Sequence, residues 1–213
     1  MSDTSPSTRW EEWTTWPLLV MSLVFIASYS IIVLRPELPT AVLVALHLLN
    51  VVIWICFAVD YLTRLVRSHR RWWFVRNNVP DLLSVIVPIF RPFRLLTYLH
   101  KVPFFRAASG AAVRIQLLIQ ALCFVVLFVY VIALAELQVE RDADGATITT
   151  FGDAVWWACV TIATVGYGDM YPVTPPGRLL AVVLMIGGIA IVGTASATVI
   201  SYLNERASGR KRR

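Results

Sequence analysis

The segment from Thr164 to Asp169, Thr-Val-Gly-Tyr-Gly-Asp, has the residue types that a binding site for a dehydrated cation needs. Such a cation requires several oxygen ligands, and a chain supplies them without carboxylates when successive backbone carbonyls turn toward one axis. Gly166 and Gly168 lack the β-carbon that opposes the unusual backbone dihedrals of such a segment. The hydroxyl of Thr164 adds a further oxygen at one end. One copy of the segment cannot surround an ion, so this chemistry predicts a site built from four copies.

A short apolar segment precedes this motif and must position it. Phe151 to Ala163 is apolar but shorter than the about 20 residues that a bilayer-spanning helix needs. Between two full spans, such a segment predicts a re-entrant helix, which is tolerated at membrane depth where protein buries it or where it lines water. We therefore expect a pore helix that ends at the motif.

The composition excludes a water-soluble domain. The chain has 213 residues, of which 58% are apolar and 15% charged, and this is the balance of a membrane protein. The runs long enough to cross a bilayer are Trp16 to Leu34, Ala41 to Leu62, Val113 to Leu137 and Leu179 to Leu203. Two shorter runs, Leu82 to Phe90 and Pro92 to Phe105, are interpreted as a helical hairpin. The predicted fold is an all-α membrane protein with six transmembrane helices, a re-entrant pore helix and a loop that carries the motif.

Basic residues give the chain a formal net charge of +6 and gather at the ends of the apolar runs. Their clusters are residues 64–76, 101–114 and 206–213. Cytoplasmic loops carry an excess of Lys and Arg, so we expect a multi-pass protein of the cell membrane with both termini in the cytoplasm. The clusters predict contacts with anionic membrane lipid at that face and no nucleic-acid binding. The acidic loop from Gln138 to Thr149 then lies on the other side.

Charge inside the apolar segments divides the chain into two modules. A linker separates them, because Pro103 and Gly110 disfavour an uninterrupted helix at this point. The expected parts are a cytoplasmic N-terminus at 1–15, a charged module at 16–106, a linker at 107–112, a pore module at 113–204 and a basic cytoplasmic tail at 205–213.

The motif and the residues before it resemble the signature of voltage-gated-type potassium channels. The resemblance rests on Thr164 to Asp169, preceded by Asp153-Ala154-Val155-Trp156-Trp157. It implies a selectivity filter formed by Thr164, Val165, Gly166, Tyr167 and Gly168, with K+ bound at the first four of these residues. It also implies a homotetramer that conducts K+ passively without a cofactor. Its four-helix voltage-sensor-like domain would be followed by a tetrameric pore domain.

The resemblance assigns supporting roles to three side chains behind the filter. Trp156 would hydrogen-bond Asp169, and Trp157 would reach the Tyr167 hydroxyl. Tryptophan and tyrosine in an apolar site need such partners. Ala163 departs from the family pattern, since many relatives have a second threonine there, so we expect filter stability or inactivation to differ.

Two glycines and one acid in the pore module leave alternatives open. Gly187 and Gly188 resemble the hinge glycine of the family's inner helix, and Gly188 fits that position best. Small residues also permit close helix packing in membranes, so a hinge role and a packing role are both open. Glu136, at the outer end of the fifth span, is either a solvated boundary residue or a polar brace behind the filter.

The second span has a spacing similar to the aromatic, acid and base cluster of voltage sensors. Phe57, Asp60 and Arg64 are three and seven residues apart and share one helical face. Asp81 resembles the acid on the third helix of such sensors. The resemblance implies that these acids pair with arginines of the fourth helix, while Phe57 separates the internal and external water crevices.

The fourth segment carries a short arginine series. Arg91 and Arg94 are three residues apart, the series then lapses, and Lys101 is out of step by one residue. We expect Arg91, Arg94 and Lys101 to sense voltage. The alternative is that the arginines only neutralise Asp60 and Asp81 and so fix a static four-helix domain, because intramembrane charges are costly unless paired.

The function predicted from these features is a potassium-selective channel gated by voltage. The alternatives are a voltage-independent potassium channel with a structural or otherwise regulated sensor-like domain, the membrane subunit of a potassium transporter, and a voltage-responsive protein without conduction. A single complete motif argues against the transporter, whose pore normally has several degenerate repeats in one chain. No nucleophile and base pair, phosphate loop or metal cluster accompanies the acids, so we do not expect an enzyme.

Overall fold

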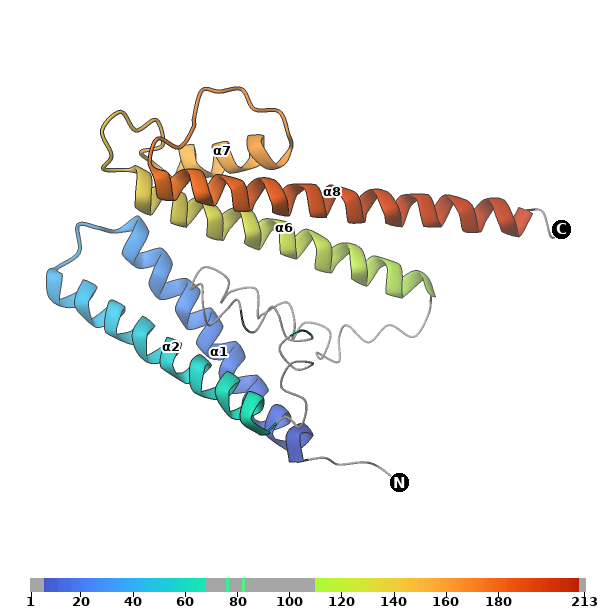
Figure 1. Cartoon of the computed structure of the whole chain (residues 1–213), viewed down its shortest axis with the longest axis horizontal. Helices are drawn as coiled ribbons and strands as arrows, with labels where there is room; N and C mark the ends of the chain where they lie inside the picture. The colour runs from blue at the N-terminus through green and yellow to red at the C-terminus, as the bar shows by residue number, and fades with distance from the viewer. Residues whose placement is uncertain (1–5, 68–75, 77–81, 83–109, 211–213) are drawn as a thin grey trace. The chain divides into compact units, whose positions relative to one another are not determined.

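The computed structural model describes the backbone of residues 6–67, 76, 82 and 110–210, and the side chains of residues 16–66, 76, 82 and 119–193. Its helices are α1 (Pro6–Leu34), α2 (Thr40–Arg67), α6 (Gly110–Glu140), α7 (Phe151–Ile162) and α8 (Pro175–Arg210) (Figure 1). Every regular element in the described residues is helical, as the predicted all-α class requires. The predicted features outside the described residues are Asp81, Arg91, Arg94, Lys101, the run Pro92 to Phe105 and most of the run Leu82 to Phe90.

Four of the described helices are long and apolar enough to cross a membrane. The qualifying segments are Trp16–Leu34, Thr40–Val66, Ile119–Glu140 and Pro175–Gly193. They overlap the four long apolar runs of the sequence, and each of those runs lies within one helix, so the four predicted spans are confirmed. The predicted short apolar helix, Phe151 to Ala163, corresponds to α7, which ends one residue earlier, at Ile162. The acidic loop begins later than predicted, because α6 continues through Glu140.

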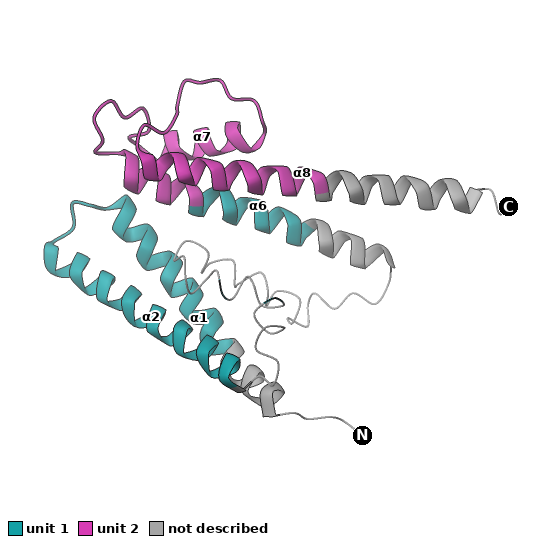
Figure 2. Ribbon diagram, viewed as in Figure 1, with its two compact units in different colours: residues 1–131 teal, residues 132–213 magenta. Residues whose placement is uncertain are grey.

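The described chain forms two compact units, residues 1–131 and 132–213 (Figure 2). In the first unit, α1 and α2 are joined by a short turn and pack along each other (Figure 1). Leu18 and Phe25 from α1 form a buried cluster with Ile53 and Phe57 from α2. Lipid tails are as apolar as these side chains, so the pair is stabilised by close packing and interhelical hydrogen bonds.

Polar side chains inside this helix pair have hydrogen-bond partners. Ser22 Oγ donates to Leu18 O at 2.9 Å, one turn earlier on α1. Ser28 Oγ donates across the pair to Asn50 Oδ1 on α2. A polar group without a partner in the bilayer core costs several kcal/mol, so the bond between Ser28 and Asn50 favours this alignment of α1 against α2.

The second unit combines the C-terminal end of α6 with α7 and α8. Ile132, Leu134 and Leu137 of α6 are completely buried, as are Ile148 in the following loop and Leu184 on α8. The short helix α7 packs against α8. This core fixes the position of α7, which in turn positions the segment that follows it.

Helix α8 keeps an apolar surface uncovered within the single chain. Leu179, Ile186 and Ile189 are among its most exposed side chains. Their spacing places them on one side of the helix. In a membrane protein such a surface meets lipid or another helix, so α8 has a face available for lipid or for a further copy of the chain.

Candidate functional site

Helix α7 begins at a reciprocal pair of hydrogen bonds. The side chain of Thr150, the N-cap, accepts a hydrogen bond from the Asp153 backbone N–H at 3.2 Å. The Asp153 carboxylate accepts one from the Thr150 backbone N–H at 2.8 Å. This capping box satisfies N–H groups that a helix start otherwise leaves without partners. Hydrogen bonds from Thr150, first from its side chain and then from its backbone, hold the pKa of Asp153 below its usual range.

Replacing Thr150 by alanine is expected to destabilise the protein by about 1 kcal/mol, the typical loss at an N-cap. A carboxylate whose pKa is lowered by folding adds stability above its unfolded pKa of about 3.9, and that stability is lost as the pH falls through the folded value. The penalty of Thr150→Ala should therefore be larger at about pH 7 than at about pH 3. Thermal unfolding in detergent measures both penalties, and equal values would contradict the role of the Asp153 carboxylate.

The end of α7 leads directly into the segment singled out by its sequence. The N–H groups of Ala163, Thr164 and Val165 still donate to carbonyls near the end of the helix, at 3.0 Å each. From there every second residue lies in the left-handed region, with φ of 59° at Thr164, 61° at Gly166 and 77° at Gly168. In a β-strand successive carbonyls point to opposite sides. This alternation of backbone handedness is instead the shape that a row of carbonyl ligands requires.

Thr164 adopts this conformation although it is not glycine. A left-handed φ costs an L-residue about 1–2 kcal/mol, and such strain persists only where the surroundings hold it. The Thr164 N–H donates to Thr161 O at 3.0 Å, which helps to hold this residue. At Gly166 and Gly168 an added β-carbon would meet no atom within 4 Å. These two glycines are therefore required by their backbone dihedrals and not by crowding within the chain.

Residues Thr164 to Asp169, called the filter segment after the role that the resemblance implies, are bonded to α7 through Trp156. Trp156 Nε1 donates to Asp169 Oδ2 at 2.8 Å, and the Trp156 ring stacks on Tyr167 with centroids 5.8 Å apart. Asp169 Oδ1 also accepts from the Met170 N–H at 3.0 Å. The bond between Trp156 and Asp169 is the contact that the resemblance implied. Trp157 is buried, and within the described part of this single chain it makes no hydrogen bond to Tyr167.

Two further sets of contacts hold the chain beyond the filter segment. The Thr147 hydroxyl donates to Tyr171 O and accepts from the Tyr171 N–H, both at 2.9 Å. Glu140 Oε2 accepts from the Val173 N–H at 2.8 Å. Glu140 Oε1 accepts from the Thr174 N–H at 2.8 Å and from the Thr174 hydroxyl at 2.6 Å. The end of α6 and the loop after it are thus bonded to the chain between the filter segment and α8.

Glu140 is the contact residue that sequence reasoning missed. The sequence pattern predicts it in the acidic loop from Gln138 to Thr149, and this prediction was wrong, because Glu140 is the last residue of α6 and its side chain is 0% exposed. Its partners Val173 and Thr174 lie more than 30 residues later, so no local pattern joins them. The available signal was the start of α8 at Pro175, since a helix N-terminus attracts a carboxylate.

Glu136 and Glu140 approach the same glycine of α8. A β-carbon built on Gly177 would lie 2.1 Å from Glu140 Oε1 and 2.6 Å from Glu136 Oε1. The Glu136 side chain is 0% exposed, and neither of its carboxylate oxygens has a hydrogen-bond partner among the described residues. Its burial excludes the interpretation of Glu136 as a solvated boundary residue. Gly177 leaves the space that both carboxyl groups reach.

The glycines proposed as a hinge lie inside α8, which remains helical through Gly187 and Gly188. A β-carbon on Gly188 would approach Ile162 of α7, at 3.2 Å from Cγ1 and 3.4 Å from the carbonyl oxygen. These distances are tighter than ordinary contacts, so Gly188 permits close packing of α8 on the end of α7. The hinge role of Gly188 stays a prediction.

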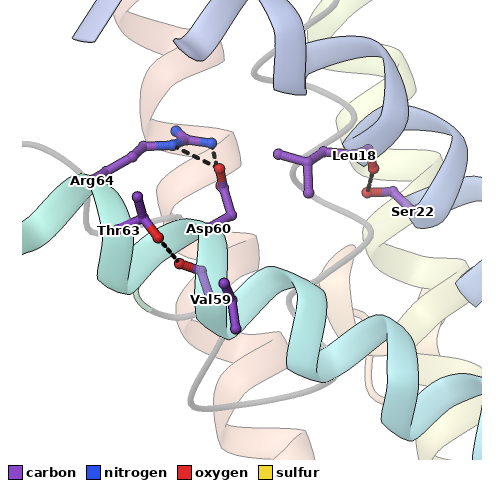
Figure 3. Close-up of polar contacts among 6 residues, drawn as sticks. All are labelled: Leu18, Ser22, Val59, Asp60, Thr63 and Arg64. Atoms are coloured by element: carbon purple, nitrogen blue, oxygen red, sulfur yellow. Dashed lines mark hydrogen bonds and ion pairs between the residues drawn. The ribbon is translucent and has the colours of Figure 1, made fainter. Parts of the chain in front are cut away.

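The aromatic, acid and base predicted on the second span lie on α2. Phe57 is completely buried. Arg64 donates to Asp60 from Nε at 3.2 Å and from Nη2, one turn along the helix (Figure 3). The side chains of Asp60 and Arg64 are 6% and 12% exposed. A paired arrangement of this kind satisfies two charges that would be costly singly inside a membrane.

Replacing Asp60 by alanine is expected to destabilise the protein by about 3–5 kcal/mol, because it removes the carboxylate with which the largely buried Arg64 side chain is paired. Unfolding in detergent measures the loss. The matched control is Glu37→Ala, which breaks an exposed ion pair with Arg35 whose side chains are 69% and 64% exposed. Such surface pairs contribute about 0–1 kcal/mol, and a similar small loss at both positions would argue against a buried pair.

Several known ion channels are similar to this chain in sequence. Residues 115–205 match the family described as Ion channel. The voltage-gated potassium channel of Aeropyrum pernix is 29% identical over 211 residues, which covers 84% of this chain and 70% of that one. The cyclic nucleotide-gated potassium channel of Mesorhizobium japonicum is 30% identical over 181 residues, which covers 74% of this chain and 49% of that one. A crystal structure of a voltage-gated K+ channel pore module in a closed state is 39% identical over 42% of this chain and 93% of that chain, with a TM-score of 0.38.

The chain spans less than two thirds of the length of several curated relatives that it matches. The matched family comprises ion channels and not enzymes. With its apolar spans, the chain is a multi-pass membrane protein. Residues 115–205 of this chain therefore carry an ion channel domain, and the relatives that match most of the chain are potassium channels.

Proposed function

We propose that the chain is one of four identical subunits of a potassium-selective channel. The proposed K+ ligands come from Thr164, Val165, Gly166 and Tyr167, and Gly168 completes the filter. The observation that carries the proposal is the alternation of handedness, with positive φ at Thr164, Gly166 and Gly168. Rings of backbone carbonyls replace the hydration shell of K+. A single copy of the chain supplies one side of such a ring.

Exposure of the filter in a single chain supports assembly into a tetramer. Val165 and Tyr167 are 52% and 67% exposed. In the tetramer, Trp156 and Asp169 brace the filter within each subunit through their hydrogen bond. Trp157, which does not bond Tyr167 within one chain, is then left to reach the Tyr167 hydroxyl of a neighbouring copy. The uncovered apolar surface of α8 provides further area for contact between copies.

Six transmembrane helices are proposed for each subunit. Four are the described spans, and the other two are the runs Leu82 to Phe90 and Pro92 to Phe105. The proposed voltage-sensor-like domain is residues 16–106, the linker is residues 107–112, and the pore domain is residues 113–204. Basic residues at the span ends support cytoplasmic termini, with residues 205–213 against anionic lipid.

Voltage is the gating stimulus that the charged module favours. The proposed sensing charges are Arg91, Arg94 and Lys101, and the proposed counter-charges are Asp60 and Asp81. One charge crossing the field is worth about 2.3 kcal/mol per 100 mV, so two arginines in each of four subunits supply up to roughly 18 kcal/mol per 100 mV. Complete burial of Phe57 beside Asp60 supports a barrier between two water crevices. The Aeropyrum relative is named a voltage-gated channel.

A second candidate is a potassium channel whose sensor-like domain is structural or regulated in another way. The observation that favours it is the pair of Asp60 with Arg64 on the same helix. An acid already compensated by its own helix attracts an arginine of another helix less strongly. Potassium channels named cyclic nucleotide-gated and calcium-gated are also among the proteins that this chain matches.

We propose that α8 bends at Gly188, with Gly187 beside it, when the channel opens. Glycine lowers helix propensity by about 1 kcal/mol relative to alanine, so a pair of glycines in the middle of α8 is a favourable place for bending. Contact of Gly188 with Ile162 would then couple the bend to the end of the pore helix.

Planar-bilayer recording of the purified protein in a K+ to Na+ gradient, over a wide range of voltage, tests selectivity and gating together. We expect a reversal potential near that of K+ and an open probability that changes with voltage. Neutralising Arg91 or Arg94 should weaken the voltage dependence and leave the reversal potential unchanged. Potassium selectivity without voltage dependence would favour the second candidate. The absence of K+-selective current from demonstrably tetrameric protein would overturn the channel proposal.

A further inference from the structure

Two acidic side chains meet behind the chain that follows the filter, and their bonding differs sharply. Glu136 and Glu140 are one helical turn apart on α6, and both side chains are 0% exposed. Glu140 accepts hydrogen bonds from the Val173 N–H and from the N–H and hydroxyl of Thr174. Glu136 accepts none among the described residues. The donors therefore stabilise a negative charge on Glu140 and do nothing for one on Glu136.

The two carboxyl groups are directed to one point. The β-carbon that Gly177 lacks would lie 2.1 Å from Glu140 Oε1 and 2.6 Å from Glu136 Oε1. Burying a carboxylate without a partner is strongly unfavourable. Two carboxylates that share a site also repel each other, and the usual outcome is that they hold one proton between them.

No other charged group of the described residues compensates a negative charge on Glu136. On its own helix the nearest are Glu140 and, beyond it, Arg141, and neither Glu136 oxygen accepts a bond from Arg141. Helix α8 presents Gly177 at this point, and the next residue, Arg178, is exposed. The acid of α7, Asp153, has its carboxylate bonded to Thr150. No described base compensates Glu136.

We propose that Glu136 binds a proton and donates it in a hydrogen bond to Glu140, so that the two carboxyl groups act as one unit that positions Val173 and Thr174. Glu136 is thus a positioning residue for the outer end of the filter. The proposal rests on the proposed channel function. While the proton is bound, Glu140 keeps a single charge and its three hydrogen bonds. When high pH removes the proton, two negative charges face each other beside Gly177, Glu140 shifts, and the filter inactivates faster.

Infrared spectroscopy of the purified full-length protein tests the proton directly, whether or not the protein conducts. A protonated carboxylic acid has a carbonyl band distinct from that of a carboxylate. At neutral pH we expect wild-type protein to show such a band, Glu136→Gln to lack it, and high pH to remove it. Identical spectra for the two proteins would overturn the proposal. They would be the result if both carboxyl groups were ionised with a water molecule between them.

Bilayer recording tests the consequence. Raising the external pH should speed inactivation of the wild type about tenfold, equivalent to about 1.4 kcal/mol. Glu136→Gln keeps a neutral donor to Glu140, so its inactivation should stay slow at every pH. Asp142→Asn, which alters an exposed acid of the following loop, should behave as the wild type does. If inactivation of Glu136→Gln kept the full pH dependence of the wild type, the proposal would be overturned. A wild type without K+ selectivity would overturn the proposed function, and the infrared result would then decide whether Glu136 binds a proton.

Discussion

Gly166→Ala is expected to abolish K+-selective current. Gly166 has a φ of 61°, and alanine in this left-handed region costs about 1–2 kcal/mol, or roughly 4–8 kcal/mol in a tetramer. An added β-carbon meets no atom within 4 Å, so the methyl group fits and the penalty comes from the backbone. Relief of that strain requires a negative φ, which would turn a carbonyl out of the row of ligands. Reversal potential and conductance in a K+ to Na+ gradient measure the loss.

Two controls separate the backbone from the added methyl group. Gly152→Ala places a methyl within α7, where the nearest atom, Thr150 Oγ1, lies 3.6 Å away, and it should leave selectivity unchanged. D-alanine at position 166 carries the same methyl but prefers positive φ, so semisynthetic protein with D-alanine should conduct K+. Normal selectivity in the L-alanine variant, or loss with D-alanine, would show that handedness at Gly166 is not what the filter requires.

Features set by the local chain were predictable from the sequence. The four described spans follow from uninterrupted apolar runs, because a bilayer demands about 20 apolar residues in a helix. The shortness of α7 followed from the same rule. The shared helical face of Asp60 and Arg64 was also readable from their spacing, since residues four apart are neighbours on a helix. The family resemblance nevertheless predicts arginines of the fourth helix as the partners of Asp60, and the structure shows it paired with Arg64.

Features that depend on packing between distant segments were not predictable. Hydropathy marks Glu136 and Glu140 as the polar end of a span, and only the approach of α8 through Gly177 turns this end into a buried pair. Thr147 meets Tyr171 across 24 residues of chain, and neither residue type signals the other. The bond of Trp156 to Asp169 joins residues that are 13 apart in the sequence, and it was anticipated only through resemblance to a family.

Glu140→Ala is expected to shorten the open lifetime of the filter more than any other change on α6. It removes the acceptor of three hydrogen bonds and leaves the N–H groups of Val173 and Thr174 without it. Hydrogen bonds to a charged group contribute about 1.5–3 kcal/mol each, so for three of them we expect a loss of at least about 4.5 kcal/mol per subunit. Current decay during sustained opening and the thermal stability of the assembled protein measure the effect. Asp142→Ala is the matched control, because Asp142 is exposed two residues later.

Gly177→Ala tests the same hydrogen bonds of Glu140 to Val173 and Thr174 without removing the Glu140 side chain. Its methyl group would stand 2.1 Å from Glu140 Oε1, the oxygen that accepts both Thr174 bonds, and 2.6 Å from Glu136 Oε1. The carboxylate must move, so its bonds to Thr174 should weaken while the one made by Oε2 to Val173 is retained in part. We therefore expect a current decay between those of the wild type and Glu140→Ala. The current of Gly177→Ala could decay as slowly as that of the wild type while the current of Glu140→Ala decays rapidly. That result would mean that the charge of Glu140 matters and its fixed position does not, and it would contradict a role of its hydrogen bonds to Val173 and Thr174.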